Sequence, residues 1–181
     1  MKLLLYCTKG KPYLNDCKLI NHNKRYFISN TGLWSVDLSQ QIYSTSLNGK
    51  VVAECDFEVE EINNCSDWYK EDLIYNTNTL SFDELLEKSC LDNQQLDDYL
   101  YANKGYAIHI KNLNIYKSPR ELSSYTCVKA PQNMQYVYTC YDKNEYVLIS
   151  IQPQWLCKIL NGEKTIEVRK KVLKRMLEND K

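Results

Sequence analysis

The sequence predicts a single α+β domain, and three observations lead to this prediction. Several segments alternate apolar and polar residues with the period of two that a strand requires, most clearly KVVAECDFEVEEI at 50–62. Two later segments instead begin with helix-capping motifs. With 181 residues, of which 44% are hydrophobic and 25% charged, the chain has the length and composition of one folded domain, 1–181.

The first half of the chain begins with an apolar strand at 2–7. The segment 15–47 is rich in Asn, Ser, Thr and Tyr, and we expect a surface excursion with a small hairpin of strands at 25–28 and 33–36. In the long alternating strand that follows, the apolar positions fall on one face. The opposite face carries Glu54, Asp56 and Glu58, which we expect to be solvated or near basic neighbours.

Two short helices and a further strand are predicted next. Ser81 and Glu84 form a capping box, and a second box-like start lies at Asp92. The strand GYAIHIKNLNIY at 105–116 contains His109 and is expected to close at Ser118 and Pro119. A lone histidine in a strand is usually a packed, hydrogen-bonded residue, and we interpret His109 in this way.

The C-terminal part reads as strand, helix, glycine turn and strand. A buried strand at 147–151 precedes Pro153, which suits the first position of a helix. Gly162, after Asn161, is expected to end that helix, and a strand returns at 163–168. The basic tail 172–181 has a helical pattern and is expected to fray.

Basic and acidic residues are unevenly distributed, although the formal net charge is zero. Residues 1–50 hold seven Lys and Arg against two Asp and Glu, 51–99 hold two against fourteen, and 100–181 hold fourteen against seven. If the two basic ends meet in space, they form a positive face suited to phosphates. Pairing of acidic and basic segments on the surface is the alternative.

The eight cysteines are scattered and form no C-x-x-C pair, whereas zinc ligands usually come in close pairs. We therefore expect reduced, mostly buried thiols, no metal site and no cofactor. The apolar start at 2–7 lacks the features of a signal peptide, and no stretch approaches the ~20 apolar residues that cross a bilayer. These features predict a cytoplasmic protein without a membrane partner.

The stretch from Ser150 to Arg169 contains GEKTIEVR after the short predicted helix. A G-x-K-x-x-E-x-R pattern in this setting resembles the signature of the ASCH family, a PUA-related β-barrel group. The segments 3–14, 48–57 and 105–122 also resemble strands of ASCH proteins from bacteriophages and their Gram-positive hosts. The resemblance spans most of the chain and implies a PUA-like small mixed β-barrel with flanking short helices and the signature strand-helix-strand at the C-terminus.

The order of these segments departs from the family. In the usual arrangement the signature opens the domain and the strand resembling 3–7 follows it, whereas here that strand opens the chain. The sequence therefore resembles a circular permutant, which domains tolerate when their termini lie close together. A dimer in which the signature swaps into a neighbouring copy is the alternative, so we expect a monomer or a swapped dimer.

The resemblance implies a ligand site at the mouth of the barrel, where the signature strand would lie beside the strand that begins at Lys2. Lysine and arginine would donate to a phosphate or base, and glutamate would accept from an exocyclic amine. The expected ligand-binding residues are Lys164, Thr165, Glu167, Arg169, Lys2, Tyr6 and Lys9. The alternative is that Glu167 and Arg169 form a surface ion pair worth about 0–1 kcal/mol.

Some small ASCH relatives are amidohydrolases on acetylated cytidine that use the motif lysine, a threonine three positions later and a distant glutamate. Lys164 matches the lysine, but Glu167 occupies the threonine position, and Thr165 would point to the opposite face of a strand. We therefore lean against an enzyme. Only in an enzyme would Lys164 and Glu167 be catalytic, as a general acid/base pair.

The function that we expect is binding of RNA or a modified nucleotide by an ASCH-type module. Two alternatives stay open: a small hydrolase or ribonuclease acting on nucleosides or RNA, and a phage-related interaction protein that acts on a host system. The expected partners are thus RNA or a nucleotide, with a host protein partner under the last alternative.

Overall fold

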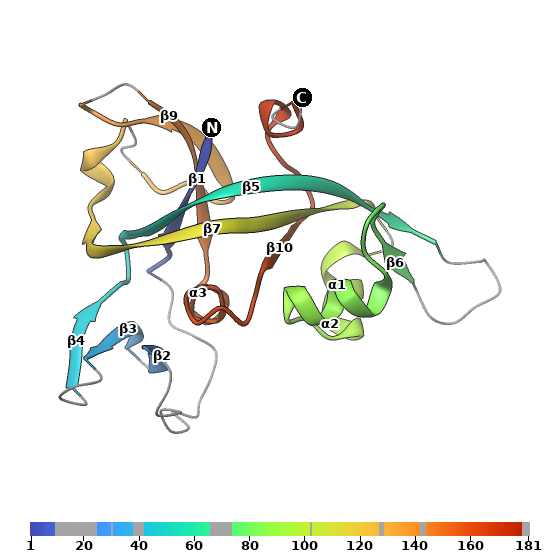
Figure 1. The fold of residues 1–181 in the computed structure, drawn as a ribbon, viewed down its shortest axis with the longest axis horizontal. Helices are drawn as coiled ribbons and strands as arrows, with labels where there is room; N and C mark the ends of the chain where they lie inside the picture. Colours follow the sequence, from blue (N-terminus) through green and yellow to red (C-terminus); the bar gives the residue numbers. More distant parts are fainter. Residues whose placement is uncertain are drawn as a thin grey trace. The chain divides into compact units, whose positions relative to one another are not determined.

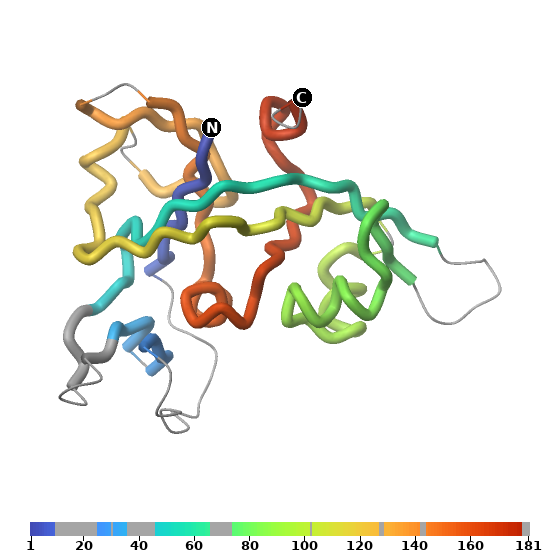
Figure 2. Tube along the Cα trace, viewed as in Figure 1, coloured from blue at the N-terminus to red at the C-terminus, as the bar shows by residue number. Residues whose placement is uncertain are grey.

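A computed structural model describes residues 1–9, 25–29, 31–37, 42–65, 74–101, 103–126, 129–141 and 144–178, without the side chains of 36, 37 and 42–45 (Figures 1 and 2). It divides into two compact units, the first formed by 1–56 and 112–162 and the second by 57–111 and 163–181. Strands and short helices occur in both, so the predicted α+β class is confirmed. The expectations for Cys17, Cys127 and much of the 15–47 excursion fall outside the described residues.

In the first unit, β1 (Lys2–Cys7) pairs antiparallel with β5 (Val51–Asn64) and parallel with β9 (Glu145–Ile151). The neighbouring β8 (Met134–Tyr138) pairs antiparallel with β9 (Figure 1). From Leu3 to Cys7 every residue of β1 is buried, so both faces of the strand are covered, which requires a continuous apolar run rather than alternation. Residues 3–5 of β1 are accordingly fully buried leucines.

The first unit also contains a separate three-stranded antiparallel sheet in the order β2 (Tyr26–Ser29), β3 (Gly32–Asp37) and β4 (Ile42–Ser46). The predicted hairpin is therefore confirmed, but the sequence analysis did not predict β4. The side-chain oxygen of Asn48 accepts a hydrogen bond from the amide of Leu33 at 3.0 Å. This bond ties the start of β3 to the turn that precedes β5.

Helix α3 (Pro153–Leu160) follows β9 and contacts β1, β2 and β3. Pro153 lies in its first turn, and Gly162 adopts the left-handed φ of 76° that ends it, as predicted. Leu156 and Ile159 are buried on the inner side of the helix. This packing holds the end of α3 beside the small sheet.

The second unit contains α1 (Phe82–Ser89), α2 (Asn93–Leu100), β6 (Tyr75–Asn76) and β10 (Ile166–Arg169). Strand β7 (Gly105–Arg120), which contributes residues to both units, pairs antiparallel with β10 here. Both helices begin with capping boxes, as predicted for Ser81 and Asp92. An apolar core joins the helices to the strands: Ile62, Tyr75, Leu80, Leu85, Leu96, Leu100, Ala107, Ile166 and Val168.

The acidic face of β5 meets polar groups of β7. In the first unit, Glu54 accepts from the hydroxyl of Tyr116 at 2.9 Å and Asp56 accepts from the amide of Asn112 at 2.8 Å. In the second unit, Glu58 pairs with Lys111. Of the two settings that we expected for this face, the structure shows polar and basic neighbours.

Two predictions were wrong. The strand expected to close at Ser118 and Pro119 continues through Pro119 to Arg120 as β7. The tail 172–181 forms only a short 3-10 turn at Lys174–Met176 within its described part, and Met176 is fully buried. Burial of this side chain anchors the segment, so the described part of the tail is not frayed.

The PUA-like barrel, the single domain and the circular permutation stay predictions. No helix in the described part of the chain is long and apolar enough to span a membrane.

Candidate functional site

The signature lysine caps helix α1 in the second unit. The ammonium of Lys164 donates to the carbonyl oxygen of Ser89 at 2.6 Å, and the amide of Thr165 donates to the carbonyl of Lys88 at 2.9 Å. The last carbonyls of a helix have no partner within it, and the helix C-terminus favours a positive charge. The lysine thus satisfies both requirements at the end of α1.

The other two signature side chains extend this contact into a buried network. Lys164 lies 3.4 Å from a carboxylate oxygen of Glu167, and the guanidinium of Arg169 lies 2.9 Å from the other oxygen. The three side chains are only 2%, 9% and 13% exposed. Burial lowers the pKa of Lys164, and the neighbouring Glu167 opposes that shift. Glu167 and Arg169 therefore do pair, but not as the surface pair that was the alternative expectation.

The remaining expected site residues lie elsewhere. Thr165 is exposed just before β10. Lys2, Tyr6 and Lys9 belong to the first unit, where Lys2 pairs with Glu54 at 3.1 Å and Tyr6 is 3% exposed. The hydrogen-bonded partner of β10 is β7, not the strand that begins at Lys2. Three of the seven expected residues are thus brought together: Lys164, Glu167 and Arg169.

The first unit contains a cavity of about 560 Å³ that the sequence analysis did not foresee. This volume lies within the range of small-molecule sites, about 300–1,000 Å³. The cavity is lined by β2, β3, the first residue after β4, the start of β5, the last part of β7 and the end of α3. Its polar lining residues are Arg25, Tyr26, Ser35, Tyr116, Lys117 and Asn161.

Two cations give the cavity its charge. Within the described ranges, Arg25 and Lys117 form no ion pair, and no Asp or Glu lines the cavity. A hollow lined by cations without a compensating acid attracts anions, and a guanidinium matches the geometry of phosphate oxygens. The cavity is therefore suited to a phosphorylated ligand.

Tyr116 is held in one orientation at the cavity. Its hydroxyl donates to Glu54 at 2.9 Å, and the guanidinium of Arg120 lies 3.8 Å from the centre of its ring. Burial, together with Tyr125 and Glu54, raises the pKa of Tyr116, so the phenol is neutral at physiological pH.

Neighbouring residues of a strand point to opposite faces, and the ring of Tyr116 packs against the cluster that includes Leu4 and Tyr6, so it lies on the other face of β7 from Ile115 and Lys117. Tyr26 is the other tyrosine of the cavity lining, and an aromatic ring there offers a surface on which a base can stack.

Comparisons with protein-family models, curated proteins and solved structures found no match for this chain. The choice between the signature network and the cavity as a ligand site therefore depends on their geometry. The polar groups of the signature network contact one another and the end of α1, whereas the cavity presents two cations that have no acidic partner within the described part of the chain. The cavity is the better candidate for a ligand site.

A weak sequence signal marked the cavity residues. Arg25 precedes Tyr26, and Lys117 follows Tyr116, so each position places a cation beside an aromatic residue. Such pairs are common in proteins and far apart here, and only the folded chain brings them to one cavity. The sequence analysis treated Arg25 and Tyr26 as part of a surface hairpin and did not single out Tyr116 or Lys117.

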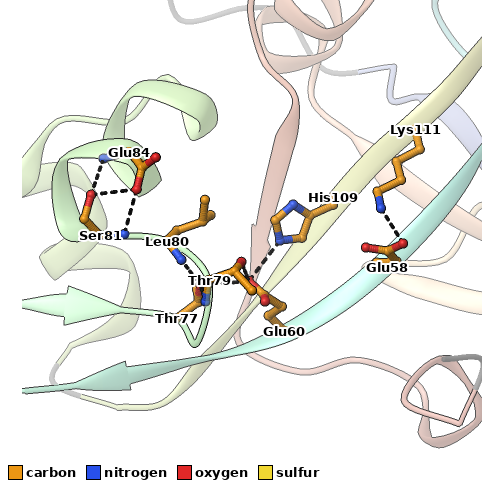
Figure 3. A network of polar contacts seen from close by, with 9 residues as sticks. All are labelled: Glu58, Glu60, Thr77, Thr79, Leu80, Ser81, Glu84, His109 and Lys111. Atoms are coloured by element: carbon orange, nitrogen blue, oxygen red, sulfur yellow. Dashed lines mark hydrogen bonds and ion pairs between the residues drawn. The ribbon is translucent and has the colours of Figure 1, made fainter. Parts of the chain in front are cut away.

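A separate polar network in the second unit surrounds Glu60 (Figure 3). Its Oε2 atom accepts from the hydroxyls of Thr77 at 2.7 Å and Thr79 at 2.8 Å, and Nε2 of His109 lies 3.1 Å away. The hydroxyl oxygen of Thr77 also accepts from the amide of Leu80 at 2.9 Å. The network fixes the loop before α1, and it agrees with the interpretation of His109 as a packed, hydrogen-bonded residue.

The Glu60 network predicts acid-sensitive stability. Partial burial acts to raise the pKa of Glu60, but hydrogen bonds from Thr77, Thr79 and His109 outweigh it and lower the pKa below 4.5. Its stabilisation is therefore complete above pH 4.5 and is lost as the pH falls through the lower folded-state pKa. Thermal melts of the wild type and Glu60→Gln between neutral and acidic pH should converge at low pH. A constant difference between them across this range would contradict the prediction.

Proposed function

We propose that this chain binds RNA or a nucleotide in the cavity of the first unit. The observation that carries the proposal is the combination of two cations and Tyr26 around a hollow whose described lining contains no acid. Arg25 and Lys117 bind phosphate oxygens, while Tyr26 offers a face for a base. These are the two kinds of contact by which proteins hold single-stranded RNA and nucleotides.

The proposal includes an ASCH-type module with a PUA-like barrel, circularly permuted and located in the cytoplasm. Its support is the signature order of β9, α3, glycine turn and β10 at the end of the chain. Leu160 and Asn161, at the end of the signature helix, line the cavity. The signature would thus shape the ligand site through the end of its helix.

Binding rather than catalysis is proposed because Lys164 and Glu167 have other partners. The ammonium of Lys164 contacts the carbonyl of Ser89, and Glu167 is shared with Arg169. These contacts favour a supporting role for the signature side chains. Direct ligand binding by them is the second candidate, and the Lys164 variant described in the Discussion tests it.

Removing both cavity cations should weaken RNA binding. For Arg25→Gln/Lys117→Gln we expect a loss on the order of tenfold in affinity for a short single-stranded RNA, because two phosphate contacts disappear. The slope of log affinity against log salt should fall by about 1.4, at about 0.7 for each contact. Fluorescence anisotropy with a fluorescein-labelled RNA, repeated over a salt series, measures both quantities.

The matched control is Lys104→Gln/Lys174→Gln, which removes the same charge from two exposed lysines outside the cavity. Its affinity should stay within about threefold of the wild type, since neither lysine lines the cavity and exposed charges outside a site act on it only through the screened general field. Equal losses in the two double variants would assign the binding to overall charge and overturn the cavity as the site. Absence of binding by the wild type to RNA and to mononucleotides would overturn the function.

A further inference from the structure

The amide of Asn161 has a fixed orientation at the cavity. Asn161 is the C-cap residue of α3, and its backbone amide donates to the carbonyl of Cys157 at 3.0 Å. In the side chain, Nδ2 donates to the carbonyl oxygen of Tyr26 at 3.0 Å and lies 3.5 Å from the sulfur of Cys157. Both hydrogens of the amide group are therefore directed at protein acceptors.

The opposite orientation of this amide is unfavourable. An asparagine side chain turned by 180° would place Oδ1 against the carbonyl oxygen of Tyr26, and two acceptors would face each other. The hydrogen-bond partners thus determine which end of the amide lies where. Nδ2 contacts β2, and Oδ1 is the remaining polar atom.

The oxygen of Asn161 is available to a ligand. Within the described part of the chain Oδ1 accepts no hydrogen bond, and it is not one of the fully buried polar atoms. Asn161 lines the cavity together with the two tyrosines and the two cations. An oriented carbonyl oxygen at the wall of such a site accepts a hydrogen bond from an N–H group.

We propose that Asn161 is a specificity-determining residue whose side-chain oxygen selects ligands with an exocyclic amine on the ring held between the cavity walls. This inference rests on the proposed function and names the chemical class of its ligand: nucleotides with amino-bearing bases. A base without an N–H donor removes water from Oδ1 and gives no hydrogen bond in return. Leaving a desolvated acceptor unsatisfied costs about 1–3 kcal/mol, which corresponds to roughly five- to 150-fold in affinity.

The test compares mononucleotides that differ only in the amine. We would titrate the wild type with AMP and with purine riboside 5′-monophosphate, and with CMP and its 4-deamino analogue, by isothermal titration calorimetry. The two amino-bearing ligands are expected to bind at least about fivefold more tightly than their analogues. Equal affinities within both pairs would overturn the role of Asn161 while leaving nucleotide binding in place. Failure of all four ligands and of RNA to bind would instead overturn the proposed function.

The variant Asn161→Leu has a similar shape but no acceptor, so the affinity ratio within each pair should fall to about one. General damage to the fold would weaken both ligands of a pair alike and leave their ratio unchanged. If Asn161→Leu does not fold, Asn161→Ser provides a smaller side chain that also lacks an acceptor at the position of Oδ1. A ratio that persists in the folded variant would overturn the assignment to Asn161.

Discussion

Replacing Lys164 by methionine is expected to lower the free energy of unfolding by about 3 kcal/mol. Methionine preserves the apolar stem of the lysine but leaves the carbonyl oxygen of Ser89 without its donor. It also removes one of the two cations beside Glu167 in a network that is 2–13% exposed. Urea unfolding followed by circular dichroism measures the change.

The control for this variant is Lys174→Met, at an exposed lysine of the tail. A substitution of this kind at the surface is expected to change the free energy of unfolding by about 0.5 kcal/mol or less. If Lys164→Met were equally mild, the buried network would not stabilise the second unit as described.

The same variant separates the two candidate sites. Folded Lys164→Met is expected to bind RNA within about threefold of the wild type, since Lys164 does not line the cavity. A folded variant that loses RNA affinity would transfer the site from the cavity to the signature side chains Lys164, Glu167 and Arg169.

Replacing Tyr26 by leucine is expected to weaken RNA binding by roughly tenfold to a hundredfold, because stacking of one base on an aromatic side chain is worth about 1–3 kcal/mol. Tyr26 lines the cavity beside Arg25, so a base on its ring would lie close to a phosphate-binding cation. Fluorescence anisotropy at constant salt measures the effect.

Tyr26→Phe is the matched control for this substitution. It keeps the ring and removes only the hydroxyl. We expect the phenylalanine variant to retain affinity within about threefold of the wild type, since the stacking face is preserved. Leucine and phenylalanine variants with the same affinity as the wild type would exclude stacking on Tyr26.

Local patterns in the sequence were sufficient for much of the fold. The strand at Lys2–Cys7 and both capping boxes were predicted correctly, because apolar periodicity and capping chemistry depend on neighbouring residues. Strand β4 was missed and the end of β7 was placed too early. Pairing with a distant strand overrides local signals such as the proline near the end of β7.

The candidate site was harder to predict than the fold. The spacing of Lys164, Glu167 and Arg169 indicated a common cluster, and the structure does bring them together. Spacing carries no information on burial, however, and so the helix end that Lys164 caps was not foreseen. The cavity was missed because Arg25 and Lys117 belong to separate segments whose proximity depends on strand pairing and on the packing of α3.

The sequence by itself determined the α+β class, the main strands and helices, and the strand-helix-strand order at the end of the chain. These follow from side-chain periodicity and turn chemistry over a few residues. Only the tertiary structure decided that the signature charges are buried and that cations, tyrosines and Asn161 surround one cavity. Burial and convergence depend on contacts between residues far apart in sequence, and local patterns do not encode such contacts.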